Sequence, residues 1–454
     1  MAKFVVTVVD PKTGNASKLF YDNVESTLSD ETGLSVVQVM SESIMTARTP
    51  VARTSKSTPV GKTSPRVLKI SLGLSCNYEC EYCSQRFVPR SQETNPEDIQ
   101  SFIDGLDSWI KEPPEKVEFW GGEPLVYIKT LRPLAEAIRA KYPLTQFTMI
   151  TNGSVLTPEI NDWIEKMDFS IGLSHDGPGQ AVRGPDPLAD PDKKAAILDL
   201  YARLSPKGKM SFNTMMNRNN PSRAAVQQFF VALTGDQFVR IGEGGIVDAY
   251  DEGGVANSLQ PQEFAAYRNL AFSEIRAGSA RNFGVLAEKI MSFVNSLRTR
   301  RPISSVGQRC SMDKPDILAV DLRGNVLTCQ NVSAVGMAPN GESHLLGSIH
   351  DLDRVKLNTA THFAHRDECL SCPVVQICQG ACMFLEGRLW DTTCNNAYSD
   401  AVPIFAAGIE FLTGLFPIHI EGQFRADRKD LFSNANSSPQ SPPPKAFPIP
   451  VVAA

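Results

Sequence analysis

The sequence lacks any long, uninterrupted run of apolar residues. At the N-terminus the apolar run is too short for a secretory signal peptide. The most apolar later stretch, residues 401–420, is interrupted by Pro403, Glu410 and Pro417, whereas a membrane-spanning helix needs about 20 predominantly apolar residues. We therefore expect a packed helix in this stretch, a cytoplasmic location and no membrane partner.

An excess of charge of one sign is also absent. The chain has 45 Lys and Arg residues against 50 Asp and Glu residues, a net charge of −5. Proteins that bind nucleic acid concentrate positive charge, so we expect no nucleic-acid partner. With 454 residues, 42% of them apolar and 21% charged, the chain is long enough for two or three globular domains.

Cysteine is absent before residue 76 and again between residues 84 and 309. The first three cysteines, Cys76, Cys80 and Cys83, form a C-x-x-x-C-x-x-C motif directly after a predicted strand. Three thiolates on one loop can hold three corners of a four-iron cluster and leave one iron open for a cofactor. A structural zinc site needs four ligands, but the nearest histidine is His175 and the next cysteine is Cys310. We therefore favour an open iron–sulfur cluster.

Predicted strands and helices alternate from residue 67 to about residue 250. Proline opens several of the helices, which is typical of a first helical turn. Six β–α repeats indicate an α/β fold with a parallel sheet and right-handed crossovers. Six repeats in place of eight predict a partial (β/α)6 barrel with an open side. The predicted strands are 67–73, 116–120, 146–151, 169–174, 209–215 and 238–242, and the helices between them are 96–110, 131–141, 158–167, 191–204 and 222–233.

Polar and glycine-rich motifs follow three of these strands, where α/β folds bind ligands. Glycine lets the backbone approach a ligand, and a glutamate accepts hydrogen bonds from an ammonium group. Each motif alone is more often an ordinary turn. Their occurrence at successive strand ends is specific. The motifs are Gly121-Gly122-Glu123-Pro124, Thr151-Asn152-Gly153 and Ser174-His175-Asp176-Gly177-Pro178.

Together with the cysteine motif, these segments resemble those of the radical S-adenosylmethionine (SAM) enzymes. The resemblance implies that the open iron chelates SAM, and that the reduced cluster cleaves SAM to a 5′-deoxyadenosyl radical that abstracts hydrogen from a substrate. It also implies a low-potential electron donor such as flavodoxin or ferredoxin. The SAM-binding residues that the resemblance implies are Tyr82, Gly121, Gly122, Glu123, Pro124, Thr151, Asn152, Ser174, Asp176 and Asn213, with Arg183 as a partner for the SAM carboxylate.

The sequence identifies no firm catalytic acid or base, and offers two weak candidates. His175 is either a local acid or base or a hydrogen-bonded turn residue, and we favour the turn residue. Glu243 follows the sixth strand and either faces the barrel mouth or is a surface charge.

The other seven cysteines lie between residues 310 and 394. Their spacing resembles the SPASM domain at all seven positions. The resemblance implies two auxiliary [4Fe–4S] clusters, and hence three clusters in the chain. It assigns Cys310, Cys329 and Cys382 to the first auxiliary cluster, and Cys369, Cys372, Cys378 and Cys394 to the second.

Two alternatives remain open for this cysteine-rich region. A zinc ribbon could use His362 and His365 as further ligands. The fourth corner of the first auxiliary cluster could be filled by Asp313 or Asp316, or stay open to solvent or substrate.

SPASM enzymes mostly modify ribosomally made peptides or proteins. Members of one branch, the anaerobic sulfatase maturases, have an aspartate base after the second SPASM cysteine, where this chain has Gln330. We therefore expect a radical SAM oxidoreductase that crosslinks side chains of a precursor peptide through carbon–carbon or thioether bonds. The alternatives are a SPASM dehydrogenase of a small molecule or protein side chain, and a non-catalytic iron–sulfur electron carrier.

Composition and motifs also predict the domain boundaries. The N-terminal segment, with strands at 3–9 and 18–21, either grips a leader peptide or caps the barrel. Helices at 263–276 and 285–297 are expected to close the barrel. The predicted regions are 1–40, the N-terminal segment; 41–66, a flexible linker; 67–300, the partial barrel; 301–432, the auxiliary-cluster domain with a C-terminal helix; and 433–454, a disordered tail.

Overall fold

The computed structural model describes residues 3–40, 48–90, 94–359 and 361–432. The expected disordered tail at 433–454 and the first part of the expected linker, residues 41–47, lie outside the described residues.

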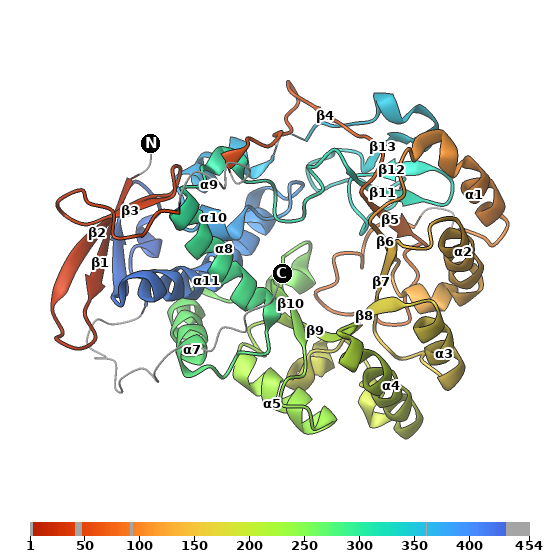
Figure 1. Ribbon diagram of the computed structural model, residues 1–454, viewed down its shortest axis with the longest axis horizontal. Coiled ribbons are helices and arrows are strands. Elements are labelled where there is room, and N and C mark those ends of the chain that lie inside the picture. The colour runs from red at the N-terminus through yellow and green to blue at the C-terminus, as the bar shows by residue number, and fades with distance from the viewer. Residues whose placement is uncertain (1–2, 41–47, 91–93, 360, 433–454) are drawn as a thin grey trace.

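Six parallel strands form the part of the sheet that carries the predicted motifs. They lie side by side in the order β10-β9-β8-β7-β6-β5, and Figure 1 shows them as an arc with helices α1–α5 on its convex side. This arrangement confirms the predicted partial α/β barrel. The strands are β5 (Val67–Ser71), β6 (Lys116–Trp120), β7 (Gln146–Thr151), β8 (Phe169–Ser174), β9 (Met210–Met216) and β10 (Ile241–Ile246).

The helices on the convex side follow the predicted positions closely. Their apolar faces pack on Leu68, Ile70 and Phe119 of the sheet. The largest shift concerns the sixth strand, which was predicted at 238–242 and lies at Ile241–Ile246. Residues 236–239 form a turn instead, in which Asp236 accepts a hydrogen bond from the Phe238 amide at 2.7 Å. The helices are α1 (Asp98–Trp109), α2 (Ile128–Lys141), α3 (Pro158–Lys166), α4 (Pro191–Leu204) and α5 (Arg223–Thr234).

The cysteine-rich region adds three strands to the same sheet. Strand β11 (Ile317–Asp321) pairs in parallel with β5, and β12 (Asn325–Leu327) and β13 (Leu345–Ser348) continue the sheet in antiparallel pairs. The sequence did not predict this junction, because the partners of β11 lie about 250 residues away along the chain. The two thiol-bearing regions are therefore joined by backbone hydrogen bonds.

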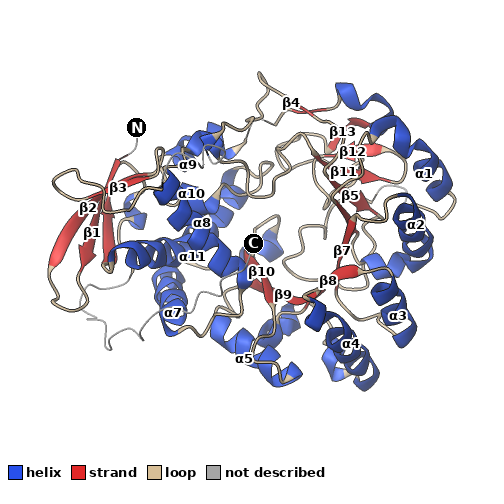
Figure 2. Cartoon of the chain, viewed as in Figure 1, coloured by secondary structure: helices blue, strands red, loops and turns tan. Residues whose placement is uncertain are grey.

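A second, antiparallel sheet combines both ends of the described chain. The order β15-β1-β2-β3 places the last strand beside the first. Figure 2 shows these strands at the opposite end of the molecule from the barrel arc. The strands are β1 (Lys3–Val9), β2 (Ala16–Asp22), β3 (Thr27–Ser29) and β15 (Phe416–Glu421).

Three long helices connect the two sheets. Helix α11 packs against α7 and α8, and it ends at Thr413, so the stretch 401–420 is a buried helix followed by a strand. None of the helices in the described part of the chain is long and apolar enough to cross a membrane. The remaining helices are α6 (Glu252–Asn257), α7 (Phe264–Ala277), α8 (Gly284–Thr299), α9 (Asp367–Leu370), α10 (Val375–Cys378) and α11 (Gly387–Thr413).

Residues 48–66 of the expected linker make specific long-range contacts. Strand β4 (Val60–Gly61) pairs with β14 (Lys356–Leu357). Lys62 is 4% exposed, and its ammonium group donates to the carbonyl oxygens of Met312, Lys314 and Ile317 at 2.7, 2.8 and 3.0 Å. This part of the chain therefore departs from the expectation of a flexible linker, because a buried ammonium group needs three fixed acceptors.

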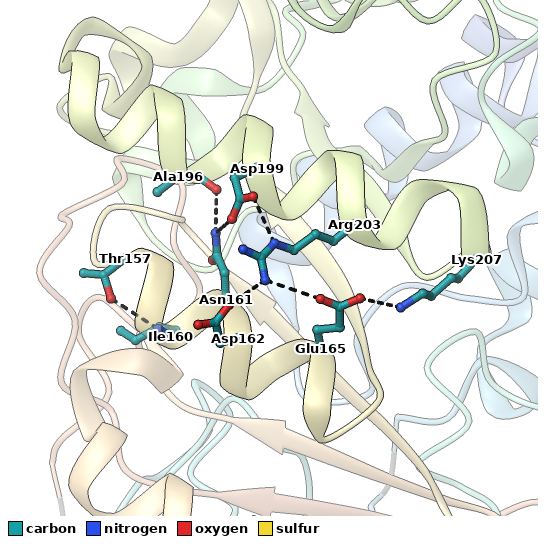
Figure 3. A network of polar contacts seen from close by, with 9 residues as sticks. All are labelled: Thr157, Ile160, Asn161, Asp162, Glu165, Ala196, Asp199, Arg203 and Lys207. Atoms are coloured by element: carbon teal, nitrogen blue, oxygen red, sulfur yellow. Dashed lines mark hydrogen bonds and ion pairs between the residues drawn. The ribbon is translucent and has the colours of Figure 1, made fainter.

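A polar network joins α3 to α4 (Figure 3). Asn161 is fully buried and donates to the Ala196 carbonyl at 2.9 Å and to Asp199 at 2.8 Å. Arg203 bridges Asp199 and Asp162 at the surface, at 2.9 and 2.6 Å. Asn161 is thus shielded from water, whereas the contacts of Arg203 lie at the surface.

We expect Asn161→Ala to lower the free energy of unfolding by about 1–3 kcal/mol, because it removes two hydrogen bonds donated by a fully buried amide group. Chemical denaturation measures the loss. Asp162→Ala, which removes a contact of an exposed carboxylate, is the matched control and should change stability by less than about 1 kcal/mol. If both substitutions lowered the free energy of unfolding equally, the buried hydrogen bonds of Asn161 would not be the part of the network that stabilises the protein.

Candidate active site

The loop that carries the first three cysteines is held by the turn after β7. Asn77 donates from Nδ2 to the Ser154 hydroxyl at 2.7 Å and accepts from Asn152 Nδ2 at 2.9 Å. Within the loop, the Cys83 amide donates to the Cys80 carbonyl at 3.0 Å. The loop conformation therefore depends on a neighbouring strand end, and Asn77 is a contributor that the sequence motif did not single out.

The three thiols of this loop are half-buried. Backbone amides of Tyr78 and Gln85 donate to the sulfurs of Cys76 and Cys83 at 3.3 and 3.4 Å. Burial raises the pKa of Cys80 to about 12, and the Arg183 cation partly opposes this rise. Such thiols stay protonated until a metal displaces the proton.

Glu123 joins two of the predicted motifs. Its carboxylate is 1% exposed and accepts from the Thr151 hydroxyl at 2.6 Å, the Asn152 amide at 2.7 Å and the Leu125 amide at 3.1 Å. A carboxylate has about four acceptor positions, so one position remains for a ligand donor. Burial raises the pKa of Glu123, against the effect of these three donors.

Gly122 packs against the backbone of the cysteine loop. A Cβ atom at this position would lie 2.6 Å from the Leu74 carbonyl oxygen, closer than atoms in contact allow. The glycine is therefore required for the approach of two loops, and its amide donates to the Gly73 carbonyl at 3.0 Å. The sequence had assigned it to the approach of a ligand.

Asp176, Arg183 and Tyr82 form one buried network. The Asp176 carboxylate is fully buried and accepts from Arg183 Nη2 at 2.9 Å, from the Met215 amide at 2.9 Å and from the Tyr82 hydroxyl. The structure thus pairs Arg183 with Asp176, where the sequence suggested a SAM carboxylate as its partner. Arg183 Nε has no hydrogen-bond partner among the described residues and is still available to a ligand.

His175 is a fully buried turn residue. Its Nδ1 accepts from the Gly177 amide at 2.9 Å, so Nε2 carries the proton and donates to Asp186 at 3.1 Å. The ring stacks on Phe229 at 5.4 Å, and burial lowers its pKa. Both ring nitrogens are engaged, which favours the structural interpretation of His175 over the catalytic one.

Three predicted residues of the barrel remain to be placed, namely Ser174, Asn213 and Glu243. Ser174 is half-buried at the end of β8. Asn213 lies opposite Gly242 and Ser174 on the neighbouring strands, and glycines at 172 and 242 leave room for its amide group. The side chain of Glu243 lies outside the described residues.

The other seven thiols gather in two neighbourhoods. The pKa of Cys382 is raised to about 12 by burial and by Cys310 and Cys329. The pKa of Cys372 is likewise raised to about 12 by burial and by Cys394 and Cys378. The first neighbourhood therefore contains Cys310, Cys329 and Cys382, and the second contains Cys372, Cys378 and Cys394 together with Cys369.

Two candidate ligands from the sequence, Asp316 and His362, are engaged elsewhere, and a third, Asp313, keeps one oxygen without a partner among the described residues. Asp316 pairs with Arg66 at 2.9 Å. His362 accepts from the Ala364 amide at 3.1 Å and donates to Asp313 at 3.2 Å, which occupies both ring nitrogens. Asp313 is 1% exposed, and its Oδ1 has no hydrogen-bond partner in the described part of the chain. His362 is therefore not arranged as a zinc ligand.

Side-chain spacing also bears on the zinc alternative. Among the described residues, no three Cys, His, Asp or Glu side chains lie close enough together to hold one metal ion. A four-iron cluster instead binds each thiolate at a different iron.

One basic residue beside a thiol was not predicted: Arg428 donates to Cys394 Sγ at 3.3 Å, and only the fold brings it there.

Comparisons with known proteins match the barrel. The family model of the radical SAM superfamily matches residues 70–223. The radical SAM cyclopropyl synthase TigE of Paramaledivibacter caminithermalis is 23% identical over 170 residues, which cover 34% of this chain and 36% of that protein. An S-adenosylmethionine-dependent nucleotide dehydratase of Pseudoalteromonas ulvae is 26% identical over 175 residues, covering 34% and 56%.

A likeness to solved structures extends further along the chain. The structure of native anSMEcpe with bound AdoMet and Kp18Cys peptide superposes with a TM-score of 0.53 at 18% identity, covering 77% of this chain and 99% of that one. At this identity the likeness concerns the fold. Residues 70–223, which the radical SAM family model matches, contain the cysteine loop and the strand-end motifs. Residues 70–223 of this chain are therefore a radical SAM domain.

Proposed function

We propose that the chain is a radical SAM enzyme that modifies a ribosomally made precursor peptide and forms a crosslink between its side chains. The observation that carries the proposal is the cysteine loop, which is fixed by hydrogen bonds to the turn after β7 beside the buried Asp176–Arg183 pair. The peptide substrate is supported by the fold, which is similar to that of anSMEcpe with bound AdoMet and peptide.

The residues of the barrel fit a bound iron–sulfur cluster and SAM. Cys76, Cys80 and Cys83 provide three thiols with two amide donors to sulfur, and the unpartnered Arg183 Nε suits an anionic group. Glu123 keeps one acceptor position for an ammonium group. When bound, the cluster and SAM would supply a reactive organic radical that abstracts hydrogen from the substrate.

The chain's own residues would position and shield the cofactor. Tyr82 is 9% exposed and its hydroxyl is fixed on Asp176, so its ring can serve as one wall of a binding site. Asp176 also accepts from the Met215 amide, which links the ends of β8 and β9. Arg183 forms an ion pair with the Asp176 carboxylate at 2.9 Å, so this pair would offer a bound cofactor no net charge.

We propose further that the two thiol neighbourhoods hold two auxiliary [4Fe–4S] clusters, with the cysteines assigned as above. Buried Asp313 with its unpartnered Oδ1 is the better carboxylate candidate near Cys310, because Asp316 is paired with Arg66. The electron donor is proposed to be a flavodoxin or ferredoxin, and the location cytoplasmic. The proposed regions are 1–40, 67–300, 301–432 and 433–454, while residues 48–66 contact the cysteine-rich region and are not proposed as a flexible linker.

The test is co-expression with each short open reading frame that adjoins the gene, followed by mass spectrometry of the peptide. Loss of two hydrogens per crosslink is the expected mass change. A reconstituted and reduced enzyme should also form 5′-deoxyadenosine. Cleavage of SAM with no modified peptide from any neighbouring frame would leave a radical SAM enzyme and remove the peptide as its substrate.

We expect about twelve irons per chain from three four-iron clusters. Replacing Cys76, Cys80 and Cys83 by alanine should leave about eight, because the seven other thiols lie in separate neighbourhoods. Metal analysis of the anaerobically purified protein measures both values. Stoichiometric zinc with about four irons would assign the region 310–394 to a zinc module.

A further inference from the structure

The concave face of the barrel sheet is polar where the convex face is apolar. On β5 and β6, Leu68, Ile70 and Phe119 are at most 1% exposed and pack under the helices. The alternate residues Lys69 and Glu118 face away from this core, and their side chains are 13% and 12% exposed. Since successive side chains of a strand point to opposite faces, the barrel lumen is lined here by charged groups.

Lys69 and Glu118 lie opposite each other on neighbouring strands, yet their contact is loose. Lys69 Nζ is 3.4 Å from Glu118 Oε2 and 5.6 Å from the centre of the Trp120 ring. Glu118 has shorter contacts with Lys116, at 2.8 Å, and with the Trp120 indole N–H, at 2.9 Å. A strong charge-assisted hydrogen bond is about 2.7–2.9 Å long, so the Lys69–Glu118 ion pair at 3.4 Å is longer than such a bond and leaves donors of the ammonium group for a further partner.

The other polar contact of Lys69 is with the cysteine-rich region. Lys69 Nζ lies 3.4 Å from Gln330 Oε1, and Gln330 follows Cys329. Strand β5 itself leads into the loop of Cys76. Lys69 thus lies in the lumen wall where the radical SAM domain meets the first auxiliary site.

The charged side chains on this face of β5 and β6 sum to plus one. Lys69 and Lys116 face one carboxylate, Glu118. The Gln330 amide adds N–H donors of the kind that bind a carboxylate. The aromatic ring of Trp120 keeps the ammonium group at the lumen wall through a cation–π contact.

We infer that Lys69, supported by Trp120 and Gln330, binds a carboxylate of the substrate in the barrel lumen. The substrate class is a peptide with a glutamate or aspartate side chain next to the site of modification. The inference rests on the proposed peptide-modifying function and deepens it. The competing explanation is that Lys69 and Glu118 form a cross-strand pair that only stabilises the sheet.

The test is anaerobic calorimetric titration of the reconstituted, unreduced protein with two blocked amino acids, N-acetyl-glutamyl amide and N-acetyl-glutaminyl amide. They differ in the side-chain charge. We expect saturable binding of the glutamyl compound, at least tenfold weaker binding of the glutaminyl compound, and at least tenfold loss of glutamyl binding in Lys69→Met. Lys129→Met, on the exposed face of α2, is the control and should bind as the native protein does.

Equal binding of the two compounds, no saturable binding of either, or unchanged binding by Lys69→Met would each overturn the inference. A lower unfolding temperature of Lys69→Met with unchanged binding would assign the residue to sheet stability. The titration measures binding and requires neither a reductant nor SAM cleavage. A negative titration would therefore overturn the role of Lys69 without overturning the proposed function. The proposed function is tested separately, by mass spectrometry of the co-expressed peptide and by formation of 5′-deoxyadenosine, which the Lys129→Met control should retain.

Discussion

Replacing Cys76, Cys80 and Cys83 together by alanine is expected to abolish formation of 5′-deoxyadenosine. These thiols are the three that lie on the loop between β5 and α1, and an iron–sulfur cluster cannot be held there without them. The other seven cysteines lie in separate neighbourhoods and cannot replace them. Chromatography of the reduced, SAM-supplied enzyme measures the product.

A matched control is Cys394→Ala, which removes one thiol from the second auxiliary neighbourhood. This variant should lose iron but continue to cleave SAM. Circular dichroism should show that both variants are folded. If the triple variant still formed 5′-deoxyadenosine, the assignment of the SAM-binding cluster to this loop would be wrong.

Replacing Arg183 by methionine is expected to lower the free energy of unfolding by about 3–5 kcal/mol, the cost of leaving one partner of a buried ion pair uncompensated. Asp176 is fully buried, and Arg183 is its one cationic partner among the described residues. The Tyr82 hydroxyl and the Met215 amide would still donate to the carboxylate, but neither carries charge. Equilibrium denaturation in guanidinium chloride measures the change.

The double variant Asp176→Asn, Arg183→Met separates charge from packing. It removes both charges and should recover part of the lost stability, because no uncompensated charge remains buried. If Arg183 Nε binds SAM as proposed, SAM binding should be impaired in both the single and the double variant. A double variant as unstable as Arg183→Met would show that the guanidinium group contributes mainly by packing.

The barrel could be predicted from the sequence because its strands and motifs are marked by residues that lie close together along the chain. The strands β6, β7 and β8 were placed to the residue, since alternating apolar positions and flanking turns mark them. The cysteine loop and the motif around Glu123 were also recognisable, because their residue types and spacing are specific. The prolines and the glutamate of the apolar stretch predicted a packed helix over 401–420, which is right as far as residue 413 and wrong for residues 416–420, because these belong to β15.

The partners of charged side chains were not predictable. The sequence suggested a cofactor carboxylate for Arg183, whereas the structure provides Asp176 seven residues away, across a turn. Lys62 was placed in a flexible linker, whereas it is buried against carbonyl groups about 250 residues away. Composition reports charge and polarity, but it contains no information on which distant acceptors the fold brings near.

The sequence by itself determined the α/β alternation, the three-cysteine loop and the strand-end motifs, since each depends on side chains close together along the chain. The tertiary structure decided three further features: the extension of the barrel sheet by β11, the joining of the first and last strands in a second sheet, and the meeting of Lys69 with Gln330. These contacts join residues far apart in sequence. Their stability comes from burial and backbone hydrogen bonds, which many sequences satisfy equally well, so no local pattern specifies them.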